Sequence, residues 1–203
     1  LDDEYVNDDT AMALGAIGPD AKAAAPKLIA AAQNWKESQS DAIRALGKIK
    51  ANGEEFAAIA PKLMEDLDLR DVTLEALAEY GAGAADAAPA VAALLESDEE
   101  RERTRAAQTL AAMGEGAKGQ LEKLKAVAAG DENRWVRQQA YDALLAIAPD
   151  DPQVLELSLA EVPEMRESQL DDIIEKLGDG APNVVEVGLK SDKPLIRAAA
   201  IRL

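Results

Sequence analysis

The sequence predicts an all-α protein built from repeated helix pairs, an α-solenoid. The clearest copy of the repeat is residues 131–147, where an acidic turn leads into an amphipathic helix. Its apolar positions are spaced i, i+3, i+4 and i+7, the pattern of one buried helical stripe. The last apolar position recurs six times, at intervals of 30 to 34 residues, a period typical of repeat architectures. These six residues are Ile17, Ile49, Tyr80, Met113, Ile147 and Leu177.

The expected elements follow the repeat in order. A lone helix over about 9–17 ends at a Gly-Pro-Asp break, and each later repeat contributes two helices. Pro26 and Pro61 fall inside expected first helices and should kink them, and residues 50–55 read as a short insertion. The expected pairs are 21–32 with a helix that follows the turn 35–40 and ends at 49, a helix after residue 55 with about 69–80, 81–96 with 99–113, and about 116–129 with 132–147. The fifth pair is expected to begin at 152 and close with 168–177, and the sixth to begin at 182.

We therefore expect one orphan N-terminal helix and about six helix pairs, forming a single solenoid over residues 1–203. No stretch shows the alternation of a strand. The first residue is Leu1, and the last residues have a helical pattern that stops at Leu203. The sequence is thus expected to be a fragment of a longer chain.

The composition bears on function. Cysteine and histidine are both absent, which removes thiolate and imidazole metal ligands, a cysteine nucleophile and the commonest general base. The net charge is −17, and such a surface should repel nucleic acids and anionic membranes. We expect no catalytic residues, no metal site and no cofactor. A cytoplasmic protein with neither nucleic-acid nor membrane partners is the corresponding prediction.

Three motifs resemble ligand sites but fit the repeat better. Residues 114–119 satisfy G-x-G-x-x-G, yet a helix precedes them, whereas a dinucleotide site requires a strand. Residues 66–71 lack the glycine and glutamate of a calcium loop. Asp171, Asp172 and Glu175 have helical spacing and are expected to form a solvated face.

The repeats resemble HEAT repeats, especially the short bacterial kind that is also found in phycobilin lyase subunits. Residues 17–21 with 25–28 match the family's inter-repeat turn and first helix, and residues 131–147 match its second helix. The resemblance covers nearly the whole chain. It implies a right-handed superhelix whose second helices line the concave side.

An arginine recurs at one position of the second helix, and each copy follows an aspartate in the preceding turn. An arginine ladder could bind phosphate or carboxylate ligands, but the spacing favours arginines that hold the turn carbonyls. Two repeats depart from this column, with Gln39 and Glu167 in place of arginine. The arginines are Arg70, Arg103, Arg137 and Arg197.

The two tryptophans, Trp35 and Trp135, are expected in the turns within repeats, where small residues would serve. Each is either an aromatic plug between repeats or an exposed anchor for a partner, because tryptophan is enriched at binding hot spots. The charged neighbours of Trp135 make it the better candidate for an aromatic anchor.

The favoured function is a non-catalytic scaffold for protein–protein interaction that uses the concave face. Counting five residues beyond the arginine column predicts a solvent-exposed ridge there, acidic through its centre, which favours a protein partner with a basic segment. The alternatives are an accessory subunit of an enzyme such as a phycobilin lyase, and a passive spacer in a larger polypeptide. The predicted ridge is Arg44, Glu75, Gln108, Asp142, Asp172 and Arg202.

Overall fold

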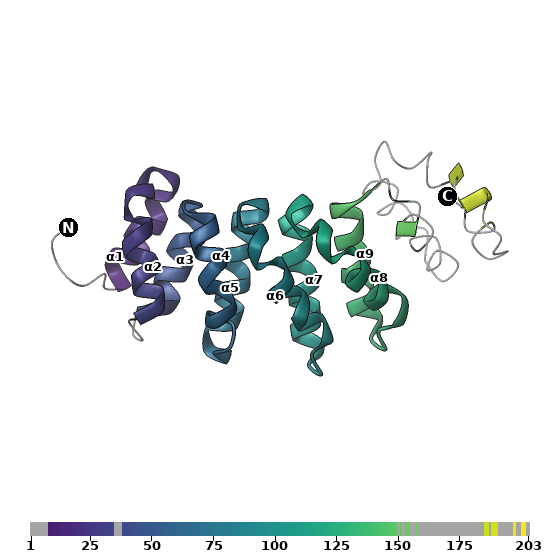
Figure 1. Ribbon diagram of the computed structural model, residues 1–203, viewed down its shortest axis with the longest axis horizontal. Coiled ribbons are helices and arrows are strands. Elements are labelled where there is room, and N and C mark those ends of the chain that lie inside the picture. The colour runs from purple at the N-terminus through teal and green to yellow at the C-terminus, as the bar shows by residue number, and fades with distance from the viewer. Residues whose placement is uncertain are drawn as a thin grey trace. The chain divides into compact units, whose positions relative to one another are not determined.

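The protein is all-α in the part that the computed structural model describes, as the sequence predicts. The described residues are 8–34 and 38–149, with isolated positions between 151 and 201. The chain divides into two compact units, Leu1–Gln120 and Leu121–Leu203. Figure 1 shows the helices in chain order.

The first unit alternates first and second helices of successive repeats. Its α-helices are α1 (Asp8–Ile17), α2 (Ala25–Asn34), α3 (Gln39–Ile49), α4 (Gly53–Leu63), α5 (Leu67–Tyr80), α6 (Ala88–Ala93) and α7 (Glu100–Met113). Its 3-10 helices are η1 (Gly18–Ala24), η2 (Gly81–Ala87), η3 (Leu94–Glu96) and η4 (Gly114–Gln120). In the second unit the described helices are α8 (Leu121–Gly130) and α9 (Arg134–Ile147), which pack against each other.

Consecutive second helices of the first unit pack side by side: α1 against α3, α3 against α5, and α5 against α7. The elements that contain the first helices form a neighbouring row, in which α2 contacts α4, α4 contacts η2, and η2 contacts η4. We call the exposed side of α1, α3, α5 and α7 the second-helix face.

Within the described residues, α1 is followed by four helix pairs, fewer than the six expected. The pairs are η1–α2 with α3, α4 with α5, η2–α6–η3 with α7, and α8 with α9. The expected fifth and sixth pairs, from residue 152 onward, lie almost wholly outside the described residues.

The expected kink at Pro26 is wrong. The chain forms the 3-10 helix η1 first, and α2 begins only at Ala25, so Pro26 lies in the first turn of an α-helix. A missing backbone N–H is tolerated there because the first-turn donors have no intrahelical acceptor. Only Pro61 lies inside a described α-helix, α4. The expected insertion is also shorter, since α4 already begins at Gly53.

The core consists mainly of alanine and leucine, as the composition suggests. Leu46, Leu77 and Leu110 occupy matching positions of α3, α5 and α7, and all three are completely buried. Within this core, Phe56 of α4 stacks on Tyr80 of α5, with ring centroids 5.2 Å apart. The Tyr80 hydroxyl donates a hydrogen bond of 2.7 Å to the carbonyl of Ala51, and burial raises the pKa of Tyr80.

Each second helix of the first unit ends in a residue with positive φ. Gly81 after α5 has φ 58° and ψ −133°, a conformation that is essentially restricted to glycine. The equivalent residue after α3 is Lys50, which adopts the left-handed helical conformation despite its side chain. This reversal turns the chain into the first helix of the next repeat.

The arginine column holds the turns within the repeats, as the spacing predicts. The guanidinium of Arg103 donates hydrogen bonds of 3.0 and 3.1 Å to the carbonyls of Ser97 and Asp98, and only 8% of this residue is exposed. Arg70 donates to the Met64 carbonyl at 2.8 Å, and Arg137 to the Asp131 carbonyl at 2.9 Å. The column therefore has a structural role in three described repeats. For Arg197 the structure offers no comparable account.

Glu102 of α7 links two of these turns. It accepts a hydrogen bond of 2.6 Å from the Ser97 hydroxyl and forms an ion pair with Arg70 of the preceding repeat. The hydroxyl and then the guanidinium lower the pKa of Glu102 below its usual value, against a partly opposing effect of burial. Arg70 therefore contacts the turn of its own repeat and also, through Glu102, the next repeat.

We expect Gly81→Ala to destabilise the protein by about 1–3 kcal/mol, because alanine is strained at this φ and ψ. Its Cβ would also lie 3.3 Å from the Ala112 carbonyl oxygen. Urea unfolding measures the change. Gly83→Ala is the matched control, because a Cβ on Gly83 meets nothing within 4 Å and φ is not positive there. An equal loss in both variants would contradict the assignment.

Arg103→Ala should lower the free energy of unfolding by about 1–3 kcal/mol, because two turn carbonyls lose a charged donor. Arg101→Ala is the comparison, since the Arg101 side chain is 74% exposed and its ion pair among the described residues is with Asp71 at the surface. Its loss should cost about 0–1 kcal/mol. Equal values in urea titrations would show that the turn hydrogen bonds contribute nothing beyond a surface ion pair.

Glu102→Gln should destabilise the protein at pH 7 and much less at about pH 3. The folded pKa of Glu102 is lowered, so its stabilising contribution is complete above the unfolded value of about 4.3. That contribution is lost as the pH falls through the folded pKa. Glu100→Gln, in the same first turn, controls for the helix dipole. A Glu102→Gln difference that does not change between the two pH values would contradict the assignment.

Candidate functional site

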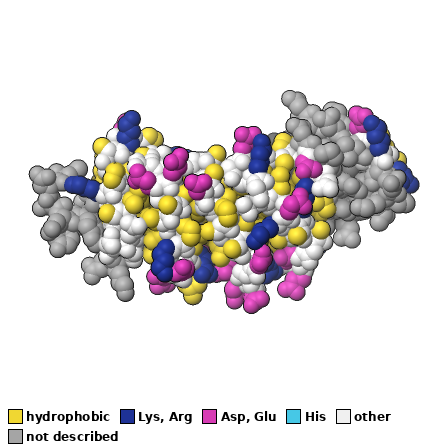
Figure 2. All heavy atoms as spheres, viewed as in Figure 1, with side chains coloured by type: hydrophobic (Ala, Val, Ile, Leu, Met, Phe, Trp, Pro, Cys, Tyr) yellow, Lys and Arg dark blue, Asp and Glu magenta, His cyan; other side chains and the backbone are white. Residues whose placement is uncertain are grey.

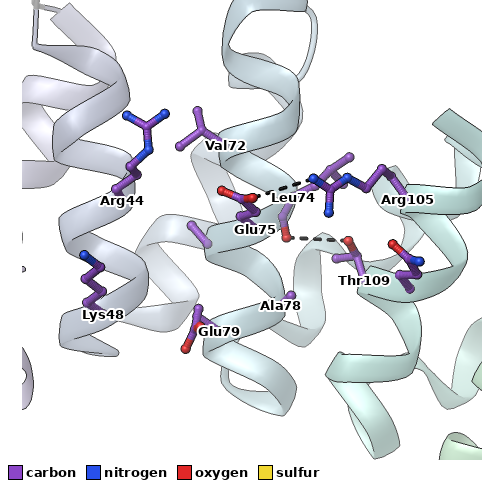
Figure 3. A pocket seen from close by; sticks show the side chains of 11 residues that line it. Arg44, Lys48, Val72, Leu74, Glu75, Ala78, Glu79, Arg105 and Thr109 are labelled. Atoms are coloured by element: carbon purple, nitrogen blue, oxygen red, sulfur yellow. Dashed lines mark hydrogen bonds and ion pairs between the residues drawn. The ribbon is translucent and has the colours of Figure 1, made fainter. Parts of the chain in front are cut away.

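Three residues of the predicted ridge meet on the second-helix face of the first unit. Arg44 lies on α3, Glu75 on α5 and Gln108 on α7, and all three are exposed. They line one open depression of about 290 Å³, shown in Figure 3. The i+5 count from the arginine column therefore brings equivalent side chains of three successive repeats to a single place.

Small residues bring α3 and α5 close together next to this depression. A Cβ on Gly47 of α3 would lie only 2.9 Å from the Cα of Ala76 on α5, so the two helices approach as closely as glycine permits. Ala76 and Ala78 add little bulk on the α5 side. Because the backbones of α3 and α5 are so near, the long charged side chains of these helices surround a shallow depression.

The walls of the depression are charged, and their charge alternates from helix to helix. Arg44 and Lys48 come from α3, Glu75 and Glu79 from α5, and Arg105 from α7. In Figure 3 Glu75 lies between the α3 cations and Arg105. The Arg105 guanidinium is 3.6 Å from the Glu75 carboxylate.

A buried hydroxyl marks the α7 side of the same depression. Thr109 replaces the alanine that most repeats have at this position, and its hydroxyl lies 3.5 Å from the Leu74 carbonyl of α5. Thr109 is only 3% exposed. The hydroxyl therefore joins α7 to the backbone of α5 rather than facing a ligand.

A second depression, of about 320 Å³, lies between α1 and α3. Met12 of α1, at the position equivalent to Arg44, borders it and is 55% exposed. Arg44 and Lys48 line this depression as well as the first. The two cations of α3 thus form the divide between neighbouring hollows of the second-helix face.

The other ridge residues do not join this site within the described structure. Asp142 lies on α9 of the second unit and is half-buried rather than exposed, and Gln138 one turn earlier donates a hydrogen bond of 3.3 Å to it. Asp172 and Arg202 lie outside the described residues.

Trp135 is exposed rather than a plug between repeats. It lies in the first turn of α9, not in the preceding turn, and is 57% exposed. Asn133 caps this helix and accepts a hydrogen bond of 2.7 Å from the Trp135 backbone N–H. The indole is thus an available aromatic surface of the second unit. Trp35 lies outside the described residues.

Three charged residues of the depression, Lys48, Glu79 and Arg105, were not predicted from the sequence. Lys48 and Glu79 each follow a ridge residue by four positions, so one further turn of the same helix would have indicated them. Arg105 precedes Gln108 by three positions, and its role depends on its distance from Glu75 of the neighbouring repeat. Helical spacing could have found all three, but their pairing could not be read from one repeat.

The surroundings of the face are acidic. Figure 2 shows magenta side chains at the lower ends of α5 and α7. Exposed carboxylates in the turns before these helices include Asp66, Asp98 and Glu99, and Asp68 is exposed in the first turn of α5. No group of three or more carboxylates in the described residues is arranged to hold a metal ion. The helices described here also include none that is long and apolar enough to cross a bilayer.

The segment Gly114–Gln120, which contains the G-x-G-x-x-G pattern, forms the 3-10 helix η4 directly after α7. A helix therefore precedes it, and the strand that a dinucleotide site requires is missing at this point. Its glycines serve the boundary between repeats, where Gly114 has a positive φ.

Comparisons with known proteins agree with the helix pairs. The family model for HEAT repeats matches residues 56–145, the segment that runs from α4 to α9. A crystal structure of an engineered protein is similar with a TM-score of 0.52 and 20% sequence identity, over 99% of this chain and 90% of that one. That likeness concerns the fold alone. No curated protein matches the sequence. The matched segment, residues 56–145, is therefore identified as HEAT repeats.

Proposed function

We propose that this chain is a non-catalytic scaffold for protein–protein interaction, with its partner lying along the second-helix face. The observation that carries the proposal is the shared depression to which three successive repeats contribute Arg44, Glu75 and Gln108. Repeat proteins generally bind extended ligands through such rows of equivalent side chains. HEAT repeats in particular suggest a protein partner.

In this proposal the repeats continue as a right-handed solenoid of six helix pairs behind the orphan helix. The second-helix face is then its concave side, and the ridge extends through Asp142, Asp172 and Arg202. Trp135 is a candidate aromatic anchor, because its indole is exposed. Neither nucleic acid nor membrane belongs to the proposal, and a cytoplasmic location stays a prediction.

The partner segment in this proposal carries lysine or arginine. The net charge of −17 favours its approach over long range. At close range it meets Glu75 and Glu79, which are each 57% exposed and belong to surface ion pairs. Surface ion pairs of this kind contribute about 0–1 kcal/mol to the free energy of unfolding. A cation of the partner can therefore replace Arg105 or Lys50 as the counter-ion of these glutamates. Association should consequently weaken with added salt.

The alternative of a chromophore-handling accessory subunit receives less support. A tetrapyrrole or similar ligand is usually held by a largely apolar, aromatic-lined pocket. Neither of the two depressions on the second-helix face has an aromatic side chain among its lining residues. The scaffold proposal needs no enclosed pocket and fits open, charged hollows.

Photo-crosslinking tests the proposed face. Gln108→p-benzoylphenylalanine, made in the cells that produce the protein, should yield a covalent adduct with a partner protein. The yield should fall as NaCl rises from about 0.05 to about 0.5 M. Ala58→p-benzoylphenylalanine is the matched control, since Ala58 is exposed on the first helix α4. An adduct from position 58 alone, or from neither position, would overturn the proposal.

A further inference from the structure

Two cations of α3, Arg44 and Lys48, lie exposed on the second-helix face, and they differ in how they are paired. Arg44 is exposed, and its ion pair is with Asp41 of its own helix at 3.3 Å. Lys48, one turn later, is exposed and makes neither an ion pair nor a hydrogen bond with any described residue. Both line the two neighbouring depressions, so a group placed in either hollow would meet them.

Three of the four carboxylates of the adjacent helix are already engaged. On α5, Asp71 pairs with Arg101 and Glu75 pairs with Arg105, both of α7. Glu79 pairs with Lys50, at 3.0 Å. Among the charged residues that line the first depression, the one left without an ion pair to a described residue is therefore the cation Lys48, although the chain as a whole is strongly acidic.

The position of Lys48 follows from the packing of α1. A Cβ on Gly15 would lie 3.4 Å from Cδ of Lys48, so the aliphatic stem of the lysine rests against the glycine. Lysine commonly covers apolar surface with its stem and keeps its ammonium group in water. The contact of its stem with Gly15 thus places the Lys48 ammonium group at the border between the two depressions.

We infer that Arg44 and Lys48 together seat a carboxylate side chain of the partner protein, and this inference rests on the proposed function. A guanidinium can donate two parallel hydrogen bonds to a carboxylate, and a neighbouring ammonium adds a point charge. The seat is for an acidic residue within a segment whose basic residues meet α5. Charge complementarity selects this occupant, because an unmatched basic residue would face two like charges here.

The spacing of the helices restricts the conformation of that segment. Packed helices lie about 8–10 Å apart. A polyproline II segment has three residues per turn and rises about 3.1 Å per residue, so residues i and i+3 point the same way about 9 Å apart. When an acidic residue of the segment lies over α3, a basic residue three positions away therefore lies over α5.

The alternation continues on both sides of these two helices. Asp8 and Asp9 are exposed on α1, while Arg101 and Arg105 stand on α7. The complementary segment is consequently base-x-x-acid-x-x-base-x-x-acid across α1, α3, α5 and α7. All four helices belong to the first unit.

The probe is a blocked, fluorescein-labelled peptide, Lys-Pro-Pro-Glu-Pro-Pro-Lys-Pro-Pro-Glu, titrated by fluorescence anisotropy. Its side-chain charges sum to zero, so attraction to the net charge of the chain cannot explain binding. We expect saturable binding that is at least tenfold weaker for Arg44→Glu with Lys48→Glu. The control Lys22→Glu with Lys62→Glu changes exposed cations of the first-helix side by the same charge and should stay within twofold of the unaltered protein.

Two further peptides separate register from composition. Lys-Glu-Pro-Pro-Pro-Pro-Pro-Pro-Lys-Glu has the same residues without the spacing and should bind at least fivefold more weakly. A peptide with the first glutamate replaced by lysine should bind the Arg44→Glu/Lys48→Glu variant at least fivefold more tightly than the control variant of equal net charge. Circular dichroism confirms that both variants are folded, and Arg44→Gln with Lys48→Gln replaces the first variant if it is not.

The inference is overturned if the peptide does not bind, if spacing has no effect, or if the charge-reversed variant binds as well as the control. A ten-nucleotide single strand that displaces the peptide at lower concentration would assign the two cations to phosphate and would equally overturn it. If Gln108→p-benzoylphenylalanine still captures the partner in the charge-reversed variant, the second-helix face remains the interaction surface. In that case only the carboxylate seat fails.

Discussion

The close contact between consecutive second helices is the constraint on which the first unit depends. At Gly47 the α3 backbone comes so near to α5 that a single methyl group would collide with the Cα of Ala76. Gly15 meets Ala45 in the same way one repeat earlier, where a Cβ on the glycine would lie 3.1 Å from the Cα of Ala45. Leucines such as Leu46 fill the space behind this contact line and are completely buried. Small residues toward the surface and leucines beneath them thus set both the packing of the repeats and the shallow hollows above it.

Much of the architecture could be predicted because it repeats. The stripe that ends at Tyr80, Met113 and Ile147 correctly located α5, α7 and α9, each of which ends at that residue. The first helices were less predictable. Whether a stretch forms a 3-10 or an α-helix depends on small differences in hydrogen bonding that apolar spacing does not encode. Apolar spacing accordingly places Pro26 inside a helix, although α2 begins immediately before it.

The candidate site could be predicted only in part, for a related reason. Helical periodicity correctly gave the exposure of Arg44, Glu75 and Gln108, because exposure depends on position within one helix. The pairing of Glu75 with Arg105 depends on how far apart two helices lie and on their relative translation. The partial burial of Asp142, which accepts a hydrogen bond from Gln138, was likewise not evident from its position within the helix. A chain with a negative net charge can therefore carry a local cluster of cations on its surface, and the net charge does not reveal this cluster.

The ion pairs between α5 and α7 also have a consequence for how such a protein can evolve. Arg101 reaches Asp71, and Arg105 reaches Glu75, so each bond joins residues about one repeat apart in the sequence. A duplicated or exchanged repeat would keep its own fold, since Arg103 holds the turn of its own repeat. It would bring the wrong charges to its new neighbours, however. Each of these surface pairs favours the present order of the repeats by only about 0–1 kcal/mol, and a rearrangement that keeps both partners of a pair adjacent would retain this contribution.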